Sequence, residues 1–165
     1  MTRPILGRID PAAFRHNYQL AKTRAPGARA WTVVKANAYG HGLLRCAEAV
    51  RDVADGFALL EIGEAMRLRN AGFTQPIMLL EGFFAEIDLQ VASANGISTA
   101  IHCEDQLRLL ELADVEQPLD VAVKLNTGMN RLGFLPERLL EVLARLRASG
   151  KTREIGVMTH FACAD

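Results

Sequence analysis

The feature that most constrains the fold is a repeated alternation of short apolar runs with amphipathic stretches, from residue 31 almost to the last residue. The apolar runs lack polar alternation, as is typical of strands that are covered on both faces. The stretches between them predict helices, because their apolar residues recur at the spacing of one helical face, as in Leu139, Val142, Leu143 and Leu146. The predicted strands are 31–35, 56–60, 76–80, 97–101, 119–125 and 155–160, and the predicted helices between them are 43–53, 63–71, 85–94, 104–113 and 136–148.

This order predicts an α/β fold with a parallel sheet, because strands and helices alternate with short connections and right-handed crossovers. Two architectures fit. An open doubly wound sheet is one, although no glycine-rich dinucleotide loop follows the first strand. A (β/α) barrel of the TIM-barrel type is the other, and it normally has eight strand–helix units. We expect the barrel type, with about six of its eight units in this chain of 165 residues.

The segment before residue 31 predicts a short strand over Ile5–Ile9 and then a helix. Asp10 is typical of a helix N-cap, and Pro11 of the first helical position. The helix should run toward Pro26.

Composition excludes several classes of function. Nineteen basic residues balance nineteen acidic ones, so no charge excess indicates nucleic acid or an anionic membrane. The sequence has no apolar run long enough to span a membrane and no signal-peptide core. Cys46, Cys103 and Cys163 are odd in number and lack zinc spacing, which favours reduced thiols in the cytoplasm and no metal site.

Polar residues follow three of the predicted strands. Lys35 ends the first, Lys124 and Arg131 lie at and after the end of the fifth, and His160 ends the sixth. In a parallel barrel the carboxyl ends of all strands gather on one face, where active sites are built. The sequence therefore predicts one polar pocket. By contrast, three charged residues around a helix start, Glu61, Glu64 and Arg67, are interpreted as a solvated face, since acids are favourable there without a function.

The first motif is Val-Val-Lys-Ala-Asn-Ala-Tyr-Gly-His-Gly, at residues 33–42. A partly buried Lys35 amine would be a nucleophile toward aldehydes. Tyr39 reaches the same pocket if the loop folds back. Gly40 and Gly42 would let backbone N–H groups turn toward an anion. The alternative is a solvated strand-end lysine beside a packing tyrosine.

Two further motifs follow later strands. Residues 124–134 read Lys-Leu-Asn-Thr-Gly-Met-Asn-Arg-Leu-Gly-Phe, and residues 159–165 read Thr-His-Phe-Ala-Cys-Ala-Asp. Taken alone, the first could be a strand and glycine turn with a solvated Arg131, and His160 could be a satisfied strand-end histidine.

Together the three motifs resemble the alanine racemase family, and the resemblance extends over the whole chain. It implies that Lys35 forms a Schiff base with pyridoxal 5'-phosphate and that Tyr39 holds the cofactor phosphate. Arg131 would bond the phenolic oxygen of the cofactor and lie near the substrate carboxylate. Lys124 would be carbamylated and would orient Arg131, and His160 would lie against the cofactor ring. Family members often carry aspartate where this chain has asparagine, at residue 126.

The implied reaction is the interconversion of L-alanine and D-alanine, with Lys35 exchanging a proton on one face of the α-carbon. D-Alanine for peptidoglycan is the expected product use, and a homodimer the expected assembly. Because family proteins are much longer, residues 1–165 would be the N-terminal part of the cofactor-binding barrel. A C-terminal β-domain would lie outside the chain, and the chain alone would be inactive.

Two alternatives come from other classes of protein. One is a non-catalytic pyridoxal-phosphate-binding barrel, which should lack the Lys124 and Arg131 pair. The other is a structural fragment that binds no ligand by itself.

Overall fold

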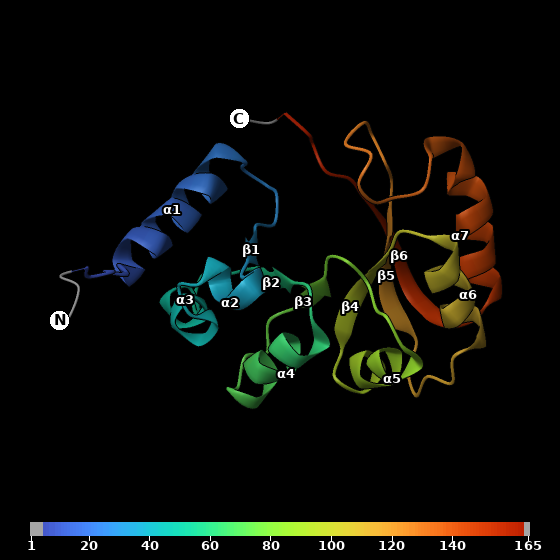
Figure 1. Ribbon diagram of the computed structural model, residues 1–165, viewed down its shortest axis with the longest axis horizontal. Helices are drawn as coiled ribbons and strands as arrows, with labels where there is room; N and C mark the ends of the chain where they lie inside the picture. The colour runs from blue at the N-terminus through green and yellow to red at the C-terminus, as the bar shows by residue number, and fades with distance from the viewer. Residues whose placement is uncertain (1–4, 164–165) are drawn as a thin grey trace.

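The computed structural model describes residues 5–163, which form a six-stranded parallel sheet flanked by helices (Figure 1). This confirms the α/β prediction. The strands are β1 (Trp31–Val33), β2 (Gly56–Leu59), β3 (Ile77–Leu79), β4 (Ile97–Ile101), β5 (Leu119–Lys124) and β6 (Thr152–Met158). The helices are α1 (Pro11–Arg24), α2 (Lys35–Tyr39), α3 (Leu43–Ala49), α4 (Ile62–Asn70), α5 (Glu86–Ala94), α6 (Glu104–Leu112) and α7 (Leu139–Ala148), with a 3₁₀ turn η1 (Pro136–Arg138) directly before α7.

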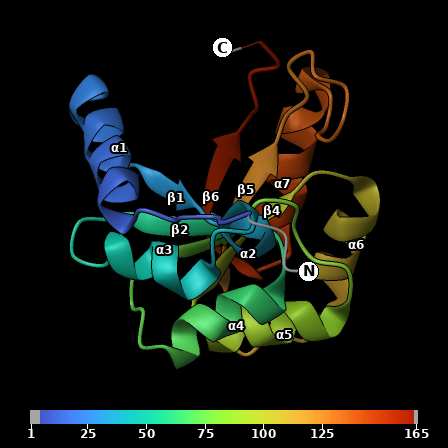
Figure 2. The ribbon, with the colours of Figure 1, turned by 60° about the vertical axis from the view of Figure 1, so that its left-hand side comes forward.

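The strands lie in the sheet in the same order as in the chain, β1 to β6, and every neighbouring pair is parallel. A doubly wound sheet would reverse its order at one point. The open doubly wound alternative is therefore wrong, and the sequential order is that of a (β/α) barrel. Within the described residues, β1 and β6 are the two edges of the sheet, and the helices follow its outer side (Figure 2).

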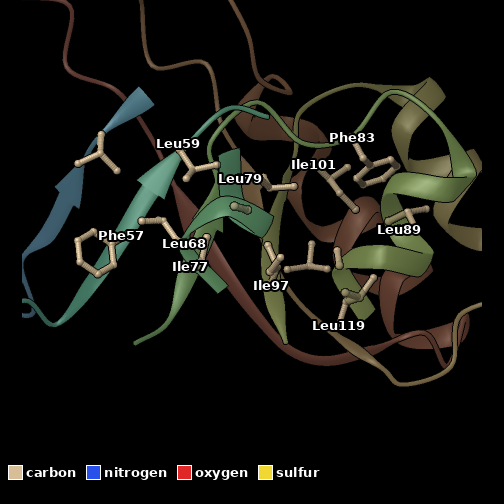
Figure 3. Close-up of a cluster of buried hydrophobic side chains, with 14 of the residues drawn as sticks. Phe57, Leu59, Leu68, Ile77, Leu79, Phe83, Leu89, Ile97, Ile101 and Leu119 are labelled. Atoms are coloured by element: carbon tan, nitrogen blue, oxygen red, sulfur yellow. The ribbon is translucent and has the colours of Figure 1, made fainter. Parts of the chain in front are cut away.

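The outer face of the sheet carries the main apolar core. Phe57, Ile77 and Ile97 occupy one register across β2, β3 and β4, and all three are fully buried. The ring of Phe57 meets that of Phe73, which follows α4, edge-on at 5.4 Å. Figure 3 shows these strand side chains packed with Leu68 of α4 and Leu89 of α5. Each such side chain stabilises the fold by about 1.5–3 kcal/mol, which makes this core the main source of stability.

The inner face of the sheet is different, because it carries small residues where β4, β5 and β6 meet. Ala100, Ala122 and Gly156 share one register across β4, β5 and β6. Side chains alternate between the two faces along a strand, so Lys124 lies on this inner face, two residues beyond Ala122. On these three strands the inner face thus carries small residues in the middle, and it becomes polar at their carboxyl ends.

Some of the predicted strands and helices differ from the observed ones in their existence or in where they begin and end. Residues Ile5–Ile9 form no strand: they lead into α1, pair with no strand, and are exposed except for the half-buried Ile9. The predicted start of α1 is confirmed: Asp10 Oδ1 accepts from the amides of Ala12 and Ala13 at 2.9 and 3.2 Å. The predicted helix 43–53 is too long, because α3 ends at Ala49. The amides of Val50 and Arg51 donate to Ala47 O and Glu48 O, three residues back, so the chain continues in turns rather than in α-helix.

Among residues 5–163, no helix is long and apolar enough to cross a membrane. No group of three His, Cys, Asp or Glu side chains in that same range is placed to hold a metal ion.

An ionic network fixes α7 to α6 on the outside of β5. Arg145 donates to Glu104 at 2.7 Å and to Glu111 at 2.8 Å, and Arg138 donates to Glu104 at 3.1 Å. The Arg145 guanidinium is the main reason that the pKa of Glu104 falls from 4.5 to about 2.

We predict that Glu104→Gln lowers the melting temperature at neutral pH and that this effect vanishes in acid. The pKa of Glu104 is lower in the folded chain than in the unfolded chain. Its stabilisation is therefore complete above about pH 4.5 and is lost as the pH falls toward about 2. Thermal unfolding of both proteins across this range tests the prediction, with the exposed Glu137→Gln as control. A melting-temperature difference that stayed constant with pH would contradict it.

Candidate active site

One pocket at the carboxyl ends of the strands brings together all five residues that the sequence singled out: Lys35, Tyr39, Lys124, Arg131 and His160. They come from three distant segments of the chain, after β1, β5 and β6. Apolar walls complete the pocket, and they include Val33, Leu60, Leu80, Leu132 and Met158. The structure thus places the predicted residues side by side, and their chemical roles stay predictions.

The sequence predicted that Lys35 ends the first strand, and this prediction is wrong. Strand β1 ends at Val33, and Lys35 begins α2. Residues 36–39 all have φ between 51° and 54°, so α2 is a turn of left-handed helix built without glycine. The turn reverses the chain and brings the Tyr39 ring within 5.8 Å of Lys35 Nζ, measured to the ring centroid. The predicted fold-back of Tyr39 toward the pocket is therefore present.

The glycines after this turn do not form the predicted anion site. The amides of Gly40, His41 and Gly42 donate to backbone oxygens of residues 36–38 at 2.9 to 3.1 Å. Because these N–H groups already have acceptors within the turn, they are not available to bind an anion.

Lys124 lies at the end of β5 and is only 8% exposed. Burial lowers its pKa, and the positive charge of Arg131 lowers it further, while Glu81 opposes the shift. A lowered pKa increases the neutral fraction of the amine, which is the nucleophilic form.

The loop after β5 carries Arg131 and is closed at its base by backbone pairing. The amide of Asn126 donates to Phe134 O, and the amide of Phe134 donates to Lys124 O, both at 2.8 Å. Only glycine fits at Gly133, since a Cβ there would lie 2.6 Å from the backbone nitrogen of Asn126. This pairing fixes the two ends of the loop that carries Arg131.

Asn126 organises the same loop through its side chain. Its Oδ1 accepts from the amides of Gly128 and Asn130 at 3.1 and 3.0 Å, and its Nδ2 donates to the side chain of Asn130 at 2.9 Å. The asparagine therefore has a clear structural use in this chain.

His160 does not end a strand, because β6 ends two residues earlier at Met158. It nevertheless lines the pocket beside Arg131. The last two residues of the third motif, Ala164 and Asp165, lie outside the described residues.

Sequence analysis missed Glu81, which also lines the pocket. The buried side chain of Gln106 holds the loop that carries it, donating to Glu81 O at 2.9 Å and to Phe83 O at 3.1 Å. Gly82 leaves the room for this contact, since a Cβ there would lie 2.3 Å from Gln106 Nε2. Glu81 follows the third apolar run as Lys35 follows the first, so the same strand-end argument would have found it.

Glu64 was also misread. It is half-buried, and its Oε1 accepts from the amide of Asn37 in the left-handed turn at 2.7 Å. The prediction of a purely solvated face is therefore wrong for this residue.

The pocket gathers two lysines and an arginine with a tyrosine hydroxyl, a set suited to an anionic ligand that carries a carbonyl group. The fold and the pocket together define a (β/α)-barrel protein with a lysine-centred site at the carboxyl ends of its strands.

Comparison with known proteins shows which family of barrel proteins the chain belongs to. A family model described as "Alanine racemase, N-terminal domain" matches residues 9–165. An alanine racemase from Acidovorax sp. (strain JS42) is 51% identical over 165 residues, all of this chain and 45% of that protein. A catabolic alanine racemase from Pseudomonas aeruginosa is 50% identical over 99% of this chain and 45% of that protein. The chain therefore belongs to the alanine racemase family.

A solved structure agrees with this assignment. The crystal structure of the biosynthetic alanine racemase from Pseudomonas aeruginosa superposes with a TM-score of 0.91 at 43% identity, covering 95% of this chain and 44% of that one. The chain thus spans less than half the length of the relatives it matches.

We predict that Asn126→Ala loosens the loop that carries Arg131. The variant loses the acceptor for two backbone amides, which should lower the free energy of unfolding by about 1 kcal/mol. Hydrogen exchange at Gly128 and Asn130 should quicken, as NMR can measure. Asn126→Asp is the matched control, because it keeps an acceptor oxygen and should retain most of the protection. Unchanged exchange in Asn126→Ala would show that the side chain does not hold the loop.

Proposed function

We propose that this chain is the N-terminal, cofactor-binding part, residues 1–165, of a pyridoxal-phosphate-dependent alanine racemase. The observation that carries the proposal is the convergence of Lys35, Tyr39, Lys124 and Arg131 in one pocket. Membership of the alanine racemase family supports the reaction, the interconversion of L-alanine and D-alanine.

The donor set fits pyridoxal 5'-phosphate. An amine, a phenol and a guanidinium meet in the pocket, and they match an aldehyde, a phosphate and a phenolic oxygen in turn. When bound, the cofactor supplies a conjugated ring that accepts negative charge from the α-carbon of an amino acid. We assign Lys35 to the aldehyde, Tyr39 to the phosphate and Arg131 to the phenolic oxygen, with His160 against the ring.

Lys35 has a second role in this proposal. An amine that is freed when the substrate amine takes its place can accept a proton from the α-carbon and return one to it. Arg131 would also attract the substrate carboxylate, since its planar fork donates two parallel hydrogen bonds to a carboxylate. Lys35 would then exchange the proton on one face of the α-carbon, while Arg131 would hold the substrate carboxylate.

Lys124 is proposed to carry a carbamate. Burial lowers its pKa and so increases the neutral amine, which attacks the carbon of CO₂ and releases a proton to water. The new negative charge would pair with Arg131 and orient its guanidinium. The lowered pKa and the shared pocket support this assignment.

Residues beyond the described pocket would complete the active protein. We propose a homodimer for the whole protein and a C-terminal β-domain that adds the remaining groups, so that residues 1–165 alone do not racemise alanine. Cys46, Cys103 and Cys163 form no disulfide within the described residues, in line with the cytoplasmic location we propose.

The biological use of D-alanine has two candidates. Peptidoglycan supply is the first. Catabolism is the second, favoured by the 50% identity to the catabolic alanine racemase of Pseudomonas aeruginosa. Deleting the gene separates them: a strain that then needs D-alanine supports peptidoglycan supply, whereas a strain that only loses growth on alanine supports catabolism.

We predict that pyridoxal phosphate followed by borohydride labels Lys35 selectively. The chain has four lysines, of which Lys35 and Lys124 line the pocket and Lys22 and Lys151 do not. Peptide mapping by mass spectrometry should find one stoichiometric adduct, on Lys35, and Lys35→Ala should abolish it.

Lys151→Ala is the matched control and should leave this labelling unchanged, because Lys151 lies just before β6, at the far end of the strand from the pocket. Equal labelling of all four lysines, or a persistent stoichiometric adduct in Lys35→Ala, would refute the assignment.

A further inference from the structure

We propose that Glu64 is a positioning residue, which holds the left-handed turn of α2 and thereby orients Lys35 and Tyr39 for the cofactor. The inference rests on the proposed function and extends it to a residue outside the pocket lining. Two observations support it: a direct hydrogen bond from α2 to α4, and the strained backbone conformation of the turn.

The turn is strained. Residues 36–39 are alanine, asparagine, alanine and tyrosine, all with φ of 51° to 54°. Left-handed helix is unfavourable for L-amino acids, because Cβ lies too close to the following carbonyl oxygen, and it normally occurs at single residues. Such a conformation persists only where the surrounding structure fixes it. The contacts that fix this turn are therefore needed for its shape.

The second half of the turn is held by its own backbone. Ala38 N donates to Val34 O at 2.8 Å, and Gly40 N donates to Ala36 O at 3.1 Å. Asn37 lies one residue before the first of these donors, where a helix leaves its amides without an internal acceptor. Glu64 Oε1 accepts from this amide at 2.7 Å and so caps the turn from a different helix.

Asn37 passes this restraint on to α3. Its side-chain Oδ1 accepts from the amide of Leu43, the first residue of α3, at 2.9 Å. The Asn37 backbone is thus tied to α4 and its side chain to α3. Lys35 and Tyr39 lie two residues to either side of this doubly anchored position, so their separation depends on it.

A carboxylate suits this task better than a neutral group. Glu64 is the third residue of α4, where the helix dipole favours a negative charge. An amide that donates to a carboxylate forms a bond roughly twice as strong as one between neutral groups. Glutamine would keep the acceptor oxygen without the charge, and alanine would remove both.

The test compares Glu64→Ala and Glu64→Gln with the wild type in the protein as its gene encodes it. Glu61→Ala is the matched control, an exposed acid three residues earlier that caps α4 without a side-chain hydrogen bond. The readouts are the pyridoxal-phosphate dissociation constant from absorbance, the rate at which the borohydride-reducible adduct forms on Lys35, and hydrogen exchange at the Asn37 amide.

Glu64→Ala should weaken cofactor binding about tenfold, slow adduct formation and speed exchange at Asn37, as expected on losing a hydrogen bond to a charged group. Glu64→Gln should restore part of each effect, and Glu61→Ala should match the wild type. All readings are taken well below the melting temperatures. Faster exchange at Asn37 would accompany any structural role of Glu64, whereas weaker cofactor binding and slower adduct formation are expected only if Glu64 also orients Lys35 and Tyr39.

Unchanged cofactor affinity and an unchanged rate of adduct formation in Glu64→Ala would overturn the inference, whether or not exchange at Asn37 becomes faster. Failure of the proposed function looks different, because then the wild type itself forms no adduct on Lys35. In that case exchange at Asn37 decides alone: faster exchange in Glu64→Ala supports Glu64 as the residue that holds the turn, and equal exchange overturns it.

Discussion

Parallel pairing of consecutive strands is the constraint on which the rest of the structure depends. Because β1 to β6 pair in chain order and in one direction, all their carboxyl ends meet at the same edge. Residues more than a hundred positions apart, such as Lys35 and His160, therefore reach one pocket. The large apolar side chains face the helices and stabilise the sheet, whereas the small inner residues leave room for a polar end.

Local devices then set the directions of the site residues, each at its own strand end. A left-handed turn reverses the chain after β1, and a loop closed around Gly133 places Arg131 after β5. The side chain of Gln106 holds the loop after β3. In each case the side chain of one residue, Glu64, Asn126 or Gln106, hydrogen-bonds backbone groups of the irregular segment. Such bonds make an irregular segment rigid enough for chemistry.

Sequence reasoning was strongest where periodicity or a long motif carried the information. The alternation of elements predicted the parallel fold, and the strand-end argument predicted that Lys35, Lys124, Arg131 and His160 meet. It failed where long-range contacts decide. No local pattern indicates that residues 36–39 adopt left-handed φ, because the restraint comes from Glu64 on a helix 27 residues away. For the same reason Glu64 looked like an ordinary acid at a helix start.

The most direct test of the central claim follows the α-proton of alanine itself. The protein as its gene encodes it would be incubated with L-alanine and pyridoxal phosphate in deuterated water, with the Lys35→Ala variant in parallel. We predict that deuterium enters the α-carbon as D-alanine forms, and that the variant loses both. Exchange no faster than with free pyridoxal phosphate would contradict the account.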